Sequence, residues 1–185
     1  MRRSVAMMDG EEAMAPLLVY IRDRDERMLL YLVTRRHSPL VKVMRGLTHL
    51  GDATVTVGIV LLLLLGAGAR SDVGWTAAFV LVFSHALVQM LKRTIARPRP
   101  ALPVGAALAE PPDRFSFPSG HAASSLSVAL GATSLLPDAL AGACLALAAV
   151  VGLSRCYLGV HYPGDVVCGW MLALISFAVA GLLGI

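Results

Sequence analysis

The sequence predicts an all-α protein: an integral membrane bundle of five transmembrane helices, preceded by an amphipathic helix at the membrane interface. Hydrophobic residues make up 57% of the 185 residues and charged residues only 15%. Soluble domains carry roughly 45–50% apolar and about 25% charged residues. The apolar residues are also gathered into long uncharged stretches. Too few polar side chains remain to cover the surface of a soluble globule of this length.

Five uncharged stretches are predicted to span the bilayer, which takes about 20 predominantly apolar residues for each helix. Polar or proline-containing breaks separate them at Asp52, Arg70–Asp72, Pro137–Asp138 and Pro163–Asp165. An open sheet is excluded at that depth because its backbone groups would lack hydrogen-bond partners. The predicted spans are Ala53–Ala69, Val73–Leu91, Ala122–Pro137, Ala139–Ser154 and Val166–Ile185.

Residues 1–45 are predicted to form an amphipathic segment on the membrane surface, and residues 46–185 the transmembrane domain. Apolar residues recur in the first segment at helical spacing with charged residues between them, a pattern typical of an interfacial helix. A solvated helix packed on the domain is the alternative. The apolar positions are Met14, Leu17, Leu18, Ile21, Met28, Leu29 and Leu32.

The charge balance, 16 Lys and Arg against 12 Asp and Glu, gives a net charge of +4. The charges are concentrated in the first 45 residues and in one loop rather than along an exposed basic stripe. Nucleic-acid binding is therefore not expected. Anionic lipid or an anionic substrate fits this distribution better.

Topology predicts that one end of the bundle carries a polar cluster. If the spans alternate in direction, the ends of the second and fourth spans and the starts of the third and fifth lie on one face of the membrane. The long proline-rich loop Lys92–Ser119 lies on the same face, and long loops in compact proteins are usually functional or disordered. The residues predicted to converge there are Lys92, Arg99, His121, Arg155, His161 and Asp165.

Three of these residues, Lys92, Arg99 and Arg155, are cations that suit a phosphate group, because phosphate spreads its charge over several oxygens. Ser119 can cap the helix that follows the loop, and Gly120 lets an anion approach free backbone N–H groups at its start. Each feature alone has an ordinary explanation, such as an interfacial anchor or a helix cap. Their combination on one face predicts a phosphate site.

Two histidines are available for a chemical step. His161 and Asp165 are four residues apart at the start of a helix, so the carboxylate can hold one ring nitrogen and leave the other free to attack phosphorus. His121, from another helix end, can protonate the leaving oxygen and then activate water. No metal and no other cofactor is expected, since the cations already neutralise charge in the transition state.

Three motifs resemble the signature motifs of the type 2 phosphatidic acid phosphatase (PAP2) superfamily in order and in spacing: Lys92-Arg-Thr-Ile-Ala-Arg-Pro-Arg99-Pro100, Pro118-Ser-Gly-His121 and Ser154-Arg155-x5-His161-x3-Asp165. The resemblance implies a helical bundle and a phosphohistidine mechanism. It implies that His161 is the nucleophile, that Asp165 orients it, and that His121 is the acid and base. The phosphate-binding residues that it implies are Lys92, Arg99, Ser119, Gly120 and Arg155.

The resemblance further implies a membrane enzyme that removes phosphate from a lipid such as phosphatidic acid, phosphatidylglycerol phosphate or undecaprenyl pyrophosphate. A phosphatase for polyprenyl-linked sugar phosphates is an alternative. So are a catalytically silent scaffold and a transport or ion-pathway protein, although a transporter would carry charges in the middle of its spans. The resemblance favours the periplasmic face of a bacterial inner membrane for the site, whereas the positive-inside rule favours the cytoplasm. Neither the lipid nor the oligomeric state is set by the sequence.

Four further polar residues have two interpretations each. His49 and Asp52 either border the pocket or cap the first span. His85 and Gln89, on the helical face that leads to the site, either extend its polar network or link two helices. Three arginines are predicted to contact lipid head groups rather than the reacting phosphate: Arg93, Arg97 and Arg114.

Overall fold

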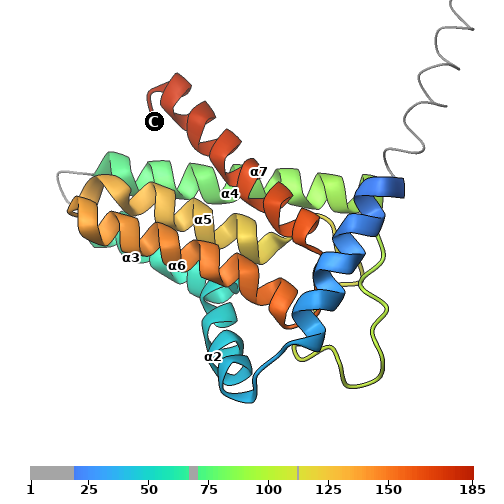
Figure 1. The fold of residues 1–185 in the computed structure, drawn as a ribbon. Coiled ribbons are helices and arrows are strands. Elements are labelled where there is room, and N and C mark those ends of the chain that lie inside the picture. The colour runs from blue at the N-terminus through green and yellow to red at the C-terminus, as the bar shows by residue number, and fades with distance from the viewer. Residues whose placement is uncertain (1–18, 67–70, 112) are drawn as a thin grey trace, which may run out of the picture.

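The computed structural model describes residues 19–66, 71–111 and 113–185, and in that part of the chain the regular elements are helices, as predicted. In Figure 1 the helices α3, α4, α5 and α6 run alongside one another and α7 crosses them. A shorter helix, α2, and the 3-10 turn η1 lead into the bundle. The elements are α2 (Ser38–Thr48), η1 (His49–Gly51), α3 (Ala53–Gly66), α4 (Ser71–Ile95), α5 (Gly120–Ala132), η3 (Thr133–Leu135), α6 (Asp138–Tyr157) and α7 (Pro163–Leu183).

Three helices are long and apolar enough to cross a membrane: Asp72–Ile95, Asp138–Tyr157 and Pro163–Leu183. A fourth span results if Ser38–Gly51 and Ala53–Gly66, which meet at a 52° bend, are counted as one. The described residues therefore hold three or four candidate spans by length and composition. The predicted count of five is not confirmed by this measure.

The difference from the predicted count lies mainly in α5, the central helix of the bundle. It has 13 residues, nine of them buried, and it packs against α3, α4, α6 and α7. Small side chains let these neighbours approach closely, and polar ones link them. The Ser84 and Ser127 hydroxyls, for example, lie 2.8 Å apart between α4 and α5.

A glycine allows α7 to cross the start of α5. A Cβ added at Gly169 would lie 2.5 Å from the carbonyl oxygen of Ser119, which is far inside van der Waals contact. The Ser119 N–H in turn donates to the carbonyl of Asp165 over 2.9 Å. The second and third predicted motifs are therefore held against each other by backbone contacts.

The N-terminal helix, residues 19–34, lies across the end of the bundle where α7 begins, and is steeply inclined to the bundle helices in Figure 1. Its Leu29 is 2% exposed and joins a cluster with Tyr162 and Val166. Ile21 and Met28 are more than half exposed. The apolar positions thus divide between a face that packs on the bundle and a face that does not. Met14, Leu17 and Leu18, and the part of the first predicted span beyond Gly66, lie outside the described residues.

Candidate active site

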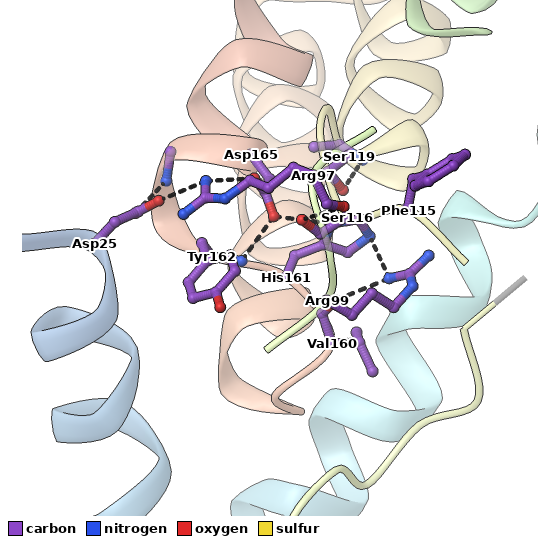
Figure 2. A network of polar contacts seen from close by, with 12 residues as sticks. Asp25, Arg97, Arg99, Phe115, Ser116, Ser119, Val160, His161, Tyr162 and Asp165 are labelled. Atoms are coloured by element: carbon purple, nitrogen blue, oxygen red, sulfur yellow. Dashed lines mark hydrogen bonds and ion pairs between the residues drawn. The ribbon is translucent and has the colours of Figure 1, made fainter. Parts of the chain in front are cut away.

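His161 lies in the short turn between α6 and α7 and is 1% exposed. Its Nδ1 is 3.4 Å from Oδ2 of Asp165, and the same oxygen accepts a hydrogen bond of 2.9 Å from the backbone N–H of Tyr162. Its Nε2 faces the loop, 3.3 Å from Nη1 of Arg99 (Figure 2). One ring nitrogen therefore faces a carboxylate, at a distance too long or an angle too poor for a hydrogen bond, and the other is directed toward a cation.

The start of α7 explains how the carboxylate reaches the imidazole. Tyr162 is the N-cap residue, Pro163 follows at the first helical position, and Asp165 is the third residue of the helix, in a capping box. This local pattern fixes the Asp165 carboxylate beside the turn that carries His161. Asp165 is fully buried.

Burial lowers the pKa of His161 from 6.5 to about 4. The cations Arg99 and Arg155 act in the same direction, and the Asp165 carboxylate opposes them. An imidazole in this environment is neutral at neutral pH, as a nucleophile must be.

Lys92 and Arg99 converge as predicted, and both bind a residue that the sequence analysis did not single out, Asp113. Lys92 Nζ donates to Oδ2 of Asp113 over 2.6 Å, and Arg99 Nη2 donates to Oδ1 over 2.9 Å. Although burial alone would raise it, the hydrogen bonds and charges of these two cations hold the pKa of Asp113 below its ordinary value. A carboxylate of the chain itself therefore sits between the two cations that were predicted to bind phosphate.

Arg155, in the last turn of α6, is a buried cation that the protein satisfies only in part. It is 2% exposed, and its Nη1 donates to the Thr48 hydroxyl over 2.7 Å. Its Nε and Nη2 have no hydrogen-bond partner among the described residues. Buried donors without partners are costly, and an anionic ligand is the group that would satisfy them.

Ser119 and Gly120 open α5 as predicted. The Ser119 hydroxyl accepts a long hydrogen bond of 3.5 Å from the N–H of Ala122. A Cβ added at Gly120 would meet only Val88, at 4.0 Å. The protein therefore leaves the space beside Gly120 free, next to the positive end of the α5 dipole.

His121, in the first turn of α5, contacts a second carboxylate. Its Nε2 is 2.8 Å from Oδ1 of Asp52, and Oδ2 of Asp52 is 2.8 Å from Nδ1 of His49. Glycine at position 51 permits this approach, because a Cβ there would lie 3.0 Å from Cβ of His121. The side chains are 13%, 38% and 66% exposed for His121, Asp52 and His49. The three form a row that runs from the site to solvent.

A cavity of about 710 Å³ adjoins this row. Its polar lining includes Arg45 and Glu110 in addition to side chains already described, and loop residues 107–111 form one wall. His49 and Asp52 thus border the pocket, one of the two interpretations of these residues, and Asp52 also accepts the first backbone hydrogen bond of α3, from Thr56.

Two of the remaining expectations are corrected. Arg97 does not face lipid: it is the centre of a mostly buried network, with its Nη1 2.8 Å from carboxylate oxygens of both Asp25 and Asp165 (Figure 2). His85 and Gln89 contact each other over 3.2 Å along α4, and within the described residues neither hydrogen-bonds to another helix or to the site. The signal for Arg97 was its spacing of two from Arg99, which places both side chains on one side of an extended segment.

These features together define a class of protein. A membrane bundle that brings three cations, the N-terminus of α5 and two histidines beside carboxylates to one end is suited to phosphoryl transfer from a membrane-borne phosphate ester.

The comparisons give the family. Residues 73–183 match the model of the PAP2 superfamily. The decaprenylphosphoryl-5-phosphoribose phosphatase of Mycobacterium tuberculosis (strain ATCC 25618 / H37Rv) is 37% identical over 145 residues, which are 76% of this chain and 78% of the relative. Phosphatidylglycerophosphatase B of Bacillus subtilis (strain 168) is 31% identical over 174 residues, 85% of this chain and 81% of the relative.

A solved structure agrees. The crystal structure of a transmembrane PAP2 type phosphatidylglycerolphosphate phosphatase from Bacillus subtilis matches with a TM-score of 0.77 and 29% identity, over 89% of this chain and 86% of that one. The chain therefore belongs to the PAP2 superfamily. It is a membrane-bound hydrolase of phosphoric monoesters or pyrophosphates, and a lipid phosphatase.

Proposed function

We propose that the protein hydrolyses the phosphate of its lipid substrate in two steps, through a phosphohistidine at His161. The observation that carries this proposal is the geometry of His161, whose Nδ1 faces Asp165 and whose Nε2 faces Arg99. Burial, and to a lesser extent the charge of Arg155, lowers the pKa of His121 from 6.5 to about 4, so His121 becomes the acid by taking up a proton when the anionic phosphate binds, since a nearby negative charge favours the charged imidazole. In the first step Nε2 attacks phosphorus, the bond from phosphorus to the leaving oxygen breaks, and protonated His121 gives that oxygen its proton. The products are the dephosphorylated lipid and the phosphohistidine.

In the second step neutral His121 takes a proton from water, the resulting hydroxide attacks phosphorus, and the bond to Nε2 breaks. Inorganic phosphate leaves and both histidines return to their starting forms. Lys92, Arg99 and Arg155, with the α5 N-terminus at Ser119 and Gly120, hold the phosphate oxygens in both steps. These cations stabilise the developing charge without a metal ion.

Substrate binding displaces Asp113 in this mechanism. Its carboxylate holds Lys92 and Arg99, and Arg99 in turn covers Nε2 of His161, which is 1% exposed. A phosphate carries more charge and more acceptor oxygens than a carboxylate. It is therefore the better partner for the same two cations, and it also satisfies the unpaired nitrogens of Arg155.

We propose that the substrate carries its phosphate monoester on a polar head group. The cavity of about 710 Å³ beside His121 is larger than a phosphate needs, and its lining includes Arg45, His49 and Glu110. Sugar or glycerol hydroxyls are suitable partners for such side chains. The two relatives are named for a phosphate on the ribose of a decaprenyl lipid and for phosphatidylglycerophosphate, and both are lipids of this kind.

We further propose five membrane helices, α3 to α7, in the bacterial inner membrane, with the site on the periplasmic face and residues 1–45 at the interface. Because α5 is enclosed by its neighbours, it does not need the length or apolarity of a lipid-facing helix.

Val104→Cys in the exposed loop and Leu140→Cys near the start of α6 test the orientation, in a background without native cysteines. A membrane-impermeant maleimide applied to intact cells should label the first and not the second, and the reverse pattern would place the site in the cytoplasm.

Phosphate release by the detergent-purified protein tests the function. The panel consists of phosphatidic acid, phosphatidylglycerol phosphate, undecaprenyl pyrophosphate and decaprenylphosphoryl-5-phosphoribose, each with and without a chelator. We expect the two lipids with polar head groups to be cleaved best, and cleavage to persist with chelator. Acid-labile phosphate from labelled substrate should be trapped on the wild type and not on His161→Ala. Release from no lipid, or release unaffected by His161→Ala, would exclude the proposed function.

A further inference from the structure

We infer that Asp25 and Arg97 are positioning residues for the nucleophile, so that the N-terminal helix takes part in catalysis through the row Asp25–Arg97–Asp165–His161. This inference rests on the proposed role of His161 and adds two residues to it. Neither residue was assigned to the site by its motifs. Both are drawn in Figure 2, where the row of ion pairs runs from the N-terminal helix into the start of α7.

The backbone after α4 directs two arginines at one target. The helix ends at Ile95, and Ala96 adopts a left-handed conformation with φ of 48°, which an alanine rarely occupies. The chain then continues in extended form, with Pro98 paired to Phe115 in an isolated bridge. Arg97 and Arg99, two residues apart, therefore project to the same side. Arg97 reaches Asp165 and Arg99 reaches His161.

Arg97 fixes which oxygen of Asp165 faces the imidazole. Its Nη1 binds Oδ1 of Asp165 over 2.8 Å, while Oδ2 faces His161 Nδ1 and the N–H of Tyr162. Both carboxylate oxygens are thus engaged, and the carboxylate cannot rotate without breaking a contact. The guanidinium also lies over the Tyr162 ring, 3.9 Å from its centroid, which restricts its own position.

Asp25 completes the arrangement from the N-terminal helix. It is 7% exposed, its Oδ2 lies 2.8 Å from Nη1 of Arg97, and its Oδ1 accepts a hydrogen bond of 2.7 Å from the N–H of Gly164. That N–H is one of the donors in the first turn of α7 that have no partner within the helix, and a negative charge is favourable there. Gly164 suits the contact, because a Cβ there would meet the Asp25 carboxylate at 3.0 Å.

The arrangement differs from a surface ion pair in what it holds. Asp23, on the same helix, makes a pair with Arg27 at 4.0 Å in which both side chains are at least half exposed, and pairs of that kind contribute little. Asp25 and Asp165 are instead buried on either side of one cation. Loss of Asp25 leaves Arg97 with a single partner and free to tilt away from Asp165. The expected consequence is a misplaced His161, and therefore a slower attack on phosphorus with unchanged phosphate binding.

Steady-state kinetics and phosphohistidine trapping of four single variants test the inference. The variants are Asp25→Asn, Arg97→Lys and the matched controls Asp23→Asn and Arg27→Lys, which make the same changes at exposed residues of the N-terminal helix. We expect kcat to fall about 10–100-fold for Asp25→Asn and Arg97→Lys, as removal of an outer partner of a functional group typically does, with KM within about twofold. Both controls should match the wild type, and the trapping rate should fall in parallel with kcat.

A double variant separates positioning from a merely structural role. If Asp25 acts through Asp165, then Asp25→Asn in the Asp165→Asn background should cause no further loss, because the group it positions is already absent. Thermal unfolding of each variant shows whether it is folded. If Asp25→Asn does not fold, then Arg97→Lys is used in its place in the double variant. The inference would be overturned if the fold-losses in kcat of the two single variants multiplied in the double variant. It would also be overturned by a change in KM alone, or by wild-type kcat in both Asp25→Asn and Arg97→Lys. Wild-type turnover that requires His161 in the same assay would leave the proposed function intact in that event.

Discussion

The site contains two histidine–carboxylate pairs that the same fold treats differently. His161 and Asp165 are almost completely buried, and Arg97 holds the carboxylate from behind. His121 and Asp52 lie beside a cavity, with side chains 13% and 38% exposed, and His49 connects them to solvent. Burial lowers the pKa of both histidines from 6.5 to about 4, so the pairs differ in their access to solvent rather than in protonation. The buried pair suits a nucleophile, which must stay fixed. The open pair suits an acid and base, which must exchange a proton in each step.

The largest expected effect comes from deleting the two imidazoles. His161→Ala removes the proposed nucleophile, and we expect turnover to fall on the order of 10⁵-fold with every substrate, as loss of a catalytic nucleophile does. His121→Ala removes only proton transfer, which contributes about 10²–10⁴-fold. The leaving group of 4-nitrophenyl phosphate needs no proton. With this substrate, the rate of the first step in His121→Ala should therefore be close to that of the wild type.

Single-turnover release of nitrophenol and of lipid alcohol measures this difference. If both variants lose the same factor with both substrates, then the histidines do not have separate roles and the comparison fails. Restored nitrophenol release in His161→Ala would reverse the two assignments.

A smaller effect is expected from neutralising the two carboxylates. Asp52→Asn should lower kcat for the lipid about 10–100-fold, in line with the loss of a partner that orients a functional histidine. The loss should shrink with the nitrophenyl substrate, because only the acid is disturbed. Asp165→Asn should slow both substrates alike, because it disturbs the nucleophile. An Asp52→Asn variant equally slow with both substrates would show that Asp52 acts on packing or on binding instead.

The sequence motifs predicted which residues converge at one end of the bundle, and spacing was enough because those residues stand at or next to helix ends on one face. The motifs did not predict the residues behind them. Asp25 lies among Arg22, Asp23, Arg24, Glu26 and Arg27, and only the packing of Leu29 against Tyr162 and Val166 shows which of these charges is buried. Asp113 and Asp52 come from a loop and a helix break, whose paths depend on tertiary contacts rather than on periodicity.

The helical class was predictable for a different reason. Apolar composition and backbone hydrogen bonding leave helices as the solution for such a chain, and the structure is helical throughout the described elements. The length of α5 was less predictable. Its small and polar residues reflect burial among four helices, whereas a count of apolar residues measures contact with lipid.

The smallest expected effect is the contribution of His161 to the pH dependence of stability. His121, whose pKa is also lowered to about 4, contributes in the same direction, and a His161 variant separates the two. Burial lowers the pKa of His161 from 6.5 to about 4, so between these values the unfolded chain binds a proton that the folded protein excludes. The contribution to folding is therefore full above pH 6.5 and is lost as the pH falls toward 4. At pH 5 the loss amounts to about 2 kcal/mol, which corresponds to a Tm lower by about 4–8 °C for a chain of this size.

His161→Gln cannot take up that proton. Its Tm should therefore fall less than the wild-type Tm between pH 8 and pH 5, and the difference between the two decreases should be about 4–8 °C. Thermal unfolding in detergent at the two pH values measures the difference. Equal losses in the two proteins would mean that His161 is already protonated in the folded protein at pH 5. A protonated imidazole has no lone pair for phosphorus, so the buried pair would then have to open to solvent before each attack. The distinction between a closed nucleophile and an open acid would no longer hold.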